Sequence, residues 1–143
     1  MPSKTVQHMV VLALDVGNVR IGVARAHTFA RLPEPVAVIN RTTEDAFARI
    51  QQLAVLYNAE KLVIGLPSHI NGTEGQQALA VRDFVKELAN YLPLKQVFVD
   101  ESYTSIEADA YLQHKRWKNQ PTNDALAACM ILQRFFSESS VNV

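Results

Sequence analysis

Three acidic residues lie at the ends or at the start of apolar segments of the chain. Asp15 closes the apolar run VVLAL, Glu101 follows the run VFVD, and Asp124 begins the last apolar segment. Each also has a purely structural explanation, because an Asp in a turn bonds its own backbone and an acid near a helix start is stabilised by the helix dipole. Only a convergence of all three in the folded chain would give them a common chemical role.

Such a convergence would require a cation, since three carboxylates at one place repel each other strongly unless a positive charge neutralises them. Carboxylate oxygens without thiolate or imidazole partners are hard ligands, which favour Mg²⁺ or Mn²⁺ over zinc. The four histidines, His8, His27, His69 and His114, show no zinc-binding spacing. The residue types therefore predict a divalent-metal site built from carboxylates and argue against a zinc site.

A basic run with one tryptophan, HKRWKNQ at residues 114–120, lies shortly before Asp124. One interpretation is a solvated loop that Trp117 anchors on the domain, and the other is contact with a nucleic acid through the cations and the indole. The residues alone do not decide between the two. Over the whole chain 14 basic residues balance 14 acidic ones, so any binding of nucleic acid must come from a local patch.

Length and composition limit the class of protein. A chain of 143 residues that is 48% hydrophobic and 20% charged can bury one core. We therefore expect a single domain over 1–143, with flexible tails at 1–8 and 138–143. Cys129 lies in an apolar helical stretch and is expected to be a buried free thiol. The apolar run at 9–14 is too short for a signal segment or a membrane span, which predicts a cytoplasmic protein with no membrane partner.

The elements that must position these residues follow from the spacing of apolar side chains. Strands are expected at residues 9–14, 20–26, 36–39, 61–66 and 97–99. A helix is expected at 47–57, with Thr42 or Thr43 as its cap. Two more are expected after the capping boxes Thr73-x-x-Gln76 and Thr104-x-x-Glu107. The last is expected at 123–136, where residues 125–132 are apolar all round and should be buried. Three antiparallel strands followed by alternating helices and strands predict a mixed α/β sheet. Ligands of such sheets bind beyond the carboxyl ends of the parallel strands, where the three acids would meet.

Four segments of the chain resemble the motifs of a known family. LALDVGNVRIGVA, VIGLPSHINGTEGQQA, VDESYTSIEA and NDALAACMILQ look like the four successive motifs of the YqgF/RuvX-type family of pre-16S rRNA nucleases or Holliday junction resolvases. Their order and spacing fit, and the resemblance runs from about Met9 to Phe136. It implies an RNase H-like fold, a mixed sheet flanked by helices, in agreement with the order of elements.

The resemblance also implies a function. The chain is expected to be a nuclease that hydrolyses phosphodiester bonds, either at the 5′ end of pre-16S rRNA in ribosome biogenesis or in Holliday junctions during DNA recombination. Asp15, Glu101 and Asp124 match the family's catalytic acids and would hold Mg²⁺ or Mn²⁺, two ions in the expected mechanism. The family pattern favours Glu101 over its neighbour Asp100. The expected substrate contacts are Arg20, Asn71, Thr73, Lys115, Arg116, Trp117 and Lys118. The expected partner is a precursor rRNA or branched DNA, bound by a monomer or weak homodimer.

Two positions depart from the family pattern. Val19 stands where DxGxKRIG has a lysine, and Ser102 stands where DERxS has an arginine. Both cations would lie near the scissile phosphate, so one alternative is a catalytically silent module of the same fold that only binds nucleic acid. Another is an ATPase, because the turn DxGxxxxG resembles the first phosphate loop of the actin/hexokinase class. Those proteins need a second domain to enclose ATP, for which 143 residues leave no room.

Overall fold

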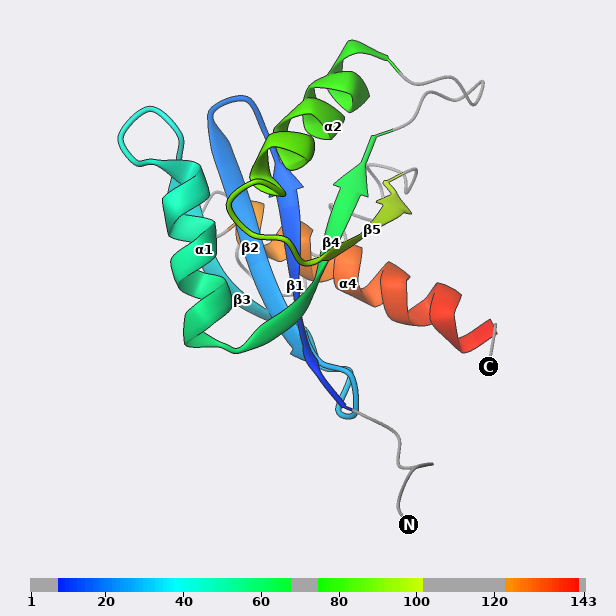
Figure 1. The fold of residues 1–143 in the computed structure, drawn as a ribbon. Coiled ribbons are helices and arrows are strands. Elements are labelled where there is room, and N and C mark those ends of the chain that lie inside the picture. The colour runs from blue at the N-terminus through cyan, green and yellow to red at the C-terminus, as the bar shows by residue number, and fades with distance from the viewer. Residues whose placement is uncertain (1–7, 68–74, 102–122, 142–143) are drawn as a thin grey trace.

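The computed structural model describes residues 8–67, 75–101 and 123–141 (Figure 1). Its strands form one mixed sheet in the order β3–β2–β1–β4–β5. Their bounds are Val10–Val16 for β1, Arg20–His27 for β2, Glu34–Asn40 for β3, Ala59–Leu66 for β4 and Lys95–Asp100 for β5. β1 to β3 pair antiparallel, whereas β4 pairs parallel with both β1 and β5. The predicted sequence of three antiparallel strands followed by parallel ones is confirmed.

Helices cover both faces of this sheet. α1 (Ala46–Leu56) and α2 (Gln76–Leu88) pack on one face, and α4 (Asn123–Val141, orange to red in Figure 1) crosses the other and contacts all five strands. No helix in the described ranges is long and apolar enough to cross a membrane. The predicted burial of residues 125–132 is confirmed for six of them, among them Cys129 with its free thiol, whereas Ala127 and Met130 are half-buried.

The alternation of side chains along β1 separates two cores. Leu12 and Leu14 belong to the core under α1 and α2, whereas Val11 and Ala13 belong to the core under α4. Large branched residues therefore fill the first face, and mainly small ones line β1 and β2 on the second. Since small residues allow a helix to approach a sheet closely, α4 can begin next to the strand backbones.

The helix caps differ from the expectation. The N-cap of α1 is Asp45, whose side chain accepts a hydrogen bond from the Ala48 N–H at 3.2 Å. Thr42 does not cap α1, because its N–H and hydroxyl both donate to Asn40 Oδ1, at 2.9 and 2.6 Å. Thr43 does not cap it either, since its hydroxyl donates to the Asn40 carbonyl at 3.4 Å.

The ends of several other elements also differ. α2 has Gly75 as its N-cap and Gln76 as its first residue, so Thr73-x-x-Gln76 is not its capping box. The box proposed at 104–107 lies outside the described residues. Residues 138–141 form the end of α4 where a tail was expected. The edge strands β3 and β5 begin earlier than predicted, because backbone pairing extends them over polar residues that apolar alternation does not mark.

Candidate active site

The three predicted acids come together at the carboxyl edge of the sheet. Asp15 is the penultimate residue of β1, Glu101 directly follows β5, and Asp124 is the second residue of α4. The Glu101 N–H donates to the carbonyl of Leu66, the last residue of β4, at 3.1 Å. Because β1, β4 and β5 run parallel, their carboxyl ends lie along the same edge, as the order of elements predicted.

Gly22 brings Asp124 to the face of the sheet that carries Asp15. Asp15 pairs with Gly22 across the β1–β2 ladder, and directly paired residues point to the same face. A Cβ on Gly22 would overlap the Asp124 carbonyl and would lie 2.9 Å from the Ala125 nitrogen. The start of α4 therefore occupies the space that a side chain at position 22 would fill.

Gly65 in β4 performs a similar role for Glu101. A Cβ on Gly65 would lie 2.7 Å from Cδ and 2.9 Å from Oε2 of Glu101, and it would overlap Cδ1 of Ile131. Glu101 is half-buried and its side chain hydrogen-bonds Asp15, whereas Asp100 is exposed. The missing side chain at position 65 thus leaves room for the Glu101 carboxylate beside Asp15.

This environment raises the pKa of Asp15 from its usual 3.8 to about 6. Burial is the main cause, the negative charge of Asp124 raises the pKa further, and the hydrogen bond with Glu101 partly offsets both. A hydrogen bond between two carboxyl groups requires a proton on one of them. A divalent cation could take the place of that proton by binding both deprotonated groups.

Asp124 is also paired with a cation of the chain itself. Arg20 Nε donates to Asp124 Oδ2 at 2.7 Å, and the Arg20 side chain is 57% exposed. Within the described residues, no three His, Cys, Asp or Glu side chains are grouped closely enough to hold a metal ion as they stand. The acids fit Mg²⁺ or Mn²⁺ in donor chemistry, since all their donors are hard oxygens, but they would have to move closer together to hold an ion.

Of the predicted substrate contacts, only Arg20 lies within the described residues, where it pairs with Asp124. Val19, at the tip of the same turn, is 49% exposed where the family pattern has lysine. The remaining candidates lie outside the described residues: Asn71, Thr73, Lys115, Arg116, Trp117, Lys118 and the departure Ser102.

Two residues that help to build this edge were not predicted. Gly22 carried a signal, because glycine inside a strand indicates a close approach of backbone or ligand. Arg41 carried none. It directly follows β3, and its Nη1 donates to the Gly17 carbonyl, two residues beyond Asp15, at 2.7 Å.

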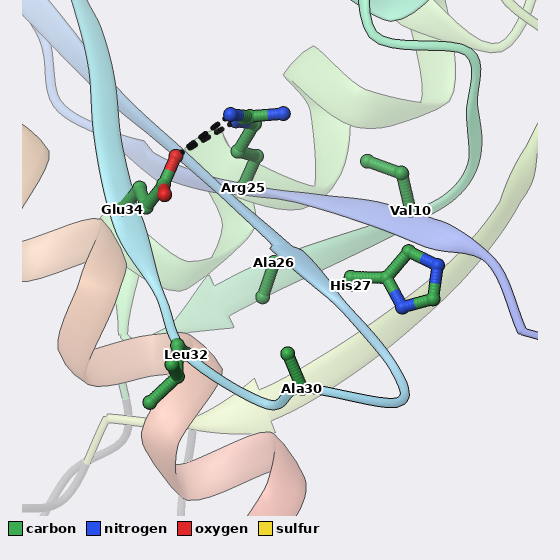
Figure 2. A pocket seen from close by; sticks show the side chains of 7 residues that line it. All are labelled: Val10, Arg25, Ala26, His27, Ala30, Leu32 and Glu34. Atoms are coloured by element: carbon green, nitrogen blue, oxygen red, sulfur yellow. Dashed lines mark hydrogen bonds and ion pairs between the residues drawn. The ribbon is translucent and has the colours of Figure 1, made fainter.

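A separate pocket opens at the other end of the β1–β2 ladder (Figure 2). Its lining residues are Val10, Arg25, Ala26, His27, Ala30, Leu32 and Glu34. It encloses about 190 Å³, and its two charged residues, Arg25 and Glu34, neutralise each other in an ion pair of 2.8 Å. With one paired carboxylate, this pocket does not resemble a metal site.

A mixed sheet in this strand order, with acids at its carboxyl edge and helices on both faces, defines an α/β protein of the RNase H-like class. Solved chains of this class share the fold. RuvC from Thermus thermophilus in complex with a Holliday junction substrate matches with a TM-score of 0.57 at 14% identity, covering 92% of this chain and 96% of that one. A second RuvC structure from Thermus thermophilus matches with a TM-score of 0.55 at 13% identity, covering 92% and 97%. The predicted fold class is confirmed.

The chain belongs to the RuvX family, whose model matches residues 9–138 and is described as Holliday junction resolvase. It is 38% identical to the protein named "Putative pre-16S rRNA nuclease" from Sulfurihydrogenibium sp. (strain YO3AOP1), over 91% of each chain. It is also 38% identical to the protein of the same name from Dechloromonas aromatica (strain RCB), over 88% of this chain and 89% of the relative. The predicted membership in a nuclease family is confirmed.

Proposed function

We propose that this chain is a metal-dependent nuclease that hydrolyses phosphodiester bonds in nucleic acid, with Asp15, Glu101 and Asp124 as its metal ligands. The observation that carries the proposal is the environment of Asp15. Its carboxyl group is buried, hydrogen-bonded to Glu101 and close enough to Asp124 for that charge to raise its pKa. Acids concentrated at the carboxyl edge of a sheet, where ligands of α/β proteins bind, favour a cation-binding role over three separate structural roles.

The chain's own residues contribute position and charge to the reaction. Asp15, Glu101 and Asp124 would hold Mg²⁺ or Mn²⁺, and two such ions, when bound, supply an activated water and stabilise the leaving oxygen. Gly22 and Gly65 provide the space in which Asp124 and Glu101 reach the face that carries Asp15. These acids need to be deprotonated to bind the metal.

Arg20 is the described cation best placed to contact substrate. Its exposed guanidinium lies beside the acids, where the phosphate to be cleaved would bind. We propose that it contacts this phosphate, together with the basic run at 115–118 and with Asn71 and Thr73. Because the net charge of the chain is zero, binding of nucleic acid needs a local positive patch, and this basic run would supply it.

The proposed substrate is the precursor of 16S rRNA, because relatives at 38% identity carry that activity in their names. A four-way DNA junction is the second candidate, because the family description names Holliday junction resolution. The proposal includes a cytoplasmic location. It also includes a monomer for RNA processing, since symmetric junction cleavage needs two active sites and therefore a dimer.

Cleavage assays on both substrates test this proposal. The purified chain is incubated with a labelled 5′ pre-16S fragment or a four-way junction, in Mg²⁺, in Mn²⁺ or in EDTA. We expect cleavage only with metal and loss of cleavage in Asp15→Asn. Asp83→Asn, the same change at an exposed residue of α2, is the matched control and should remain active. Binding of either substrate without cleavage in both metals would instead identify a silent nucleic-acid-binding module.

A further inference from the structure

Arg41 holds the turn that follows Asp15. Its Nη1 donates to the Gly17 carbonyl at 2.7 Å, and its backbone N–H donates to the Val19 carbonyl at 2.8 Å. The turn itself is closed by the Gly17 N–H, which donates to the Arg20 carbonyl at 2.9 Å. One residue from the end of β3 thus binds two carbonyls of a turn between two other strands.

The Arg41 guanidinium also ends a column of stacked rings. Its Cζ lies 4.7 Å from the ring centroid of Phe84 in α2. Phe84 stacks on Phe47 of α1 with centroids 4.8 Å apart, and Phe47 stacks on Tyr91 at 5.1 Å. A guanidinium that packs its face on an aromatic ring keeps its in-plane N–H groups available for hydrogen bonds. The column therefore supports the guanidinium whose Nη1 donates to the Gly17 carbonyl.

Asp15 needs such support because strand pairing holds it on one side only. β1 pairs with β4 as far as Leu14 opposite Ile64, whereas on the β2 side the pairing includes Asp15 opposite Gly22. Arg20, at the other end of the turn, is paired with Asn40 of β3, so a displaced turn would move mainly its Gly17 end and Asp15 with it. Support for the Gly17 end must come from outside the β1–β2 hairpin, and Arg41 provides it.

We infer that Arg41 is a positioning residue of the active site, which fixes the turn at 17–20 and through it the place of Asp15. This inference rests on the proposed function, because it takes Asp15 to be a metal ligand. Arg41 acts on the turn and not on the substrate. Its removal should therefore lower kcat and metal affinity while KM for nucleic acid stays unchanged. Small displacements of catalytic groups cost up to about a hundredfold in rate, so we expect kcat to fall about 10- to 100-fold.

Arg41→Ala is compared with Arg49→Ala as a matched control. Arg49 is also a half-buried arginine near the start of α1, but its Nη1 pairs with Glu44 at 2.7 Å. Five quantities are measured for each variant: kcat, KM, Mn²⁺ affinity by calorimetry, Tm, and the hydrogen exchange of the amides at 17–20. Arg41→Ala should lower kcat, weaken Mn²⁺ binding and speed exchange in the turn. Arg49→Ala should change none of these three at a comparable decrease in Tm.

The conservative variant Arg41→Lys extends the test and replaces Arg41→Ala if that protein does not fold. Lysine keeps the charge but has no planar face for Phe84, so it should restore only part of kcat. Equal effects of Arg41→Ala and Arg49→Ala at matched Tm would overturn the inference in favour of a general stabilising role. A raised KM with unchanged kcat would overturn it in favour of direct substrate contact.

The wild-type protein separates this inference from the proposed function. If the wild type binds no Mn²⁺ and cleaves neither substrate, the proposed function fails and the inference fails with it. If the wild type does both and Arg41→Ala behaves as Arg49→Ala does, only the role of Arg41 is wrong.

Discussion

Gly22 and Asp124 are in direct backbone contact, and the Asp124 carbonyl occupies the position that a Cβ on Gly22 would take. Gly22 lies opposite Asp15 in the sheet, so this contact brings the start of α4 to the acid at the end of β1. A backbone carbonyl cannot move aside as the tip of a flexible side chain can. The absence of a side chain at position 22 therefore sets the distance between two of the proposed metal ligands.

Gly22→Ala should push the first turn of α4 away from the sheet. Overpacking of this kind costs about 1 to 3 kcal/mol of unfolding free energy, and the displacement of Asp124 should lower cleavage more than tenfold in the fraction that remains folded. Urea denaturation and kinetics measure the two effects. Ala24→Gly, at a buried position on the same face of β2, is the control that reduces stability without displacing α4. Wild-type kcat in Gly22→Ala would contradict the proposed role of this contact.

Asp15→Asn should abolish cleavage and leave the metal-free protein as stable as the wild type or more stable. The substitution removes one of several crowded negative charges, and the new amide can donate a hydrogen bond to Glu101. Cleavage assays and urea denaturation in EDTA at pH 7 check both parts. A decrease in stability as large as that of a core mutation would instead support a structural role of Asp15 in the turn.

The raised pKa of Asp15 predicts how metal-free stability depends on pH. The pKa is 3.8 in the unfolded chain and about 6 in the fold, so the folded state binds this proton more tightly. The contribution to stability is fully present below about pH 4 and disappears as the pH rises through 6. Relative to Asp15→Asn, the wild type should lose on the order of 2 kcal/mol over this window. Urea denaturation of both proteins in EDTA from pH 4 to 8 measures it, and a difference that does not vary with pH would contradict the raised pKa.

The positions of the acids could be predicted because they depend on short, local patterns. The apolar run at 10–14 is followed directly by Asp15, and the run at 97–99 is followed by Asp100 and Glu101. Both acids are therefore placed at strand ends, and parallel strands share an edge. Asp124 could be placed because the apolar stretch that follows it is long enough to be a buried helix. All three predictions rest on side-chain types within a few neighbouring positions.

The contacts that position these acids could not be predicted in the same way. Gly22 contacts the backbone of Asp124, which lies far along the chain. Because one partner has no side chain and the other contributes its backbone carbonyl, the residue types do not show that these two positions meet. Arg41 binds carbonyls, which every residue has, so its partner in the turn could not be identified. The cap of α1 was chosen wrongly for a related reason, since Thr42, Thr43 and Asp45 all have suitable side chains and only the geometry at Asn40 excludes the first two.

The family pattern has a lysine at the position of Val19, and a basic run elsewhere in the chain is predicted to supply the missing positive charge. This run consists of Lys115, Arg116 and Lys118, which lie outside the described residues. Replacing all three by alanine should weaken binding to every nucleic-acid sequence and flatten its salt dependence. On duplex DNA the log–log slope should change by up to about 0.9 for each phosphate that is no longer neutralised. Tm and Mn²⁺ affinity should stay unchanged.

Lys86→Ala with Lys95→Ala is the control for this triple variant, because both lysines are exposed and Lys95 begins β5 at the edge opposite Glu101. This pair should leave the salt slope unaltered. Trp117→Ala separates stacking from packing. Stacking predicts that binding weakens by about 1 to 3 kcal/mol on unpaired substrates and little on duplex, whereas packing predicts a lower Tm without substrate preference. An unchanged slope in the triple variant would mean that the 115–118 run is only solvated, and phosphate contact would then fall to Arg20.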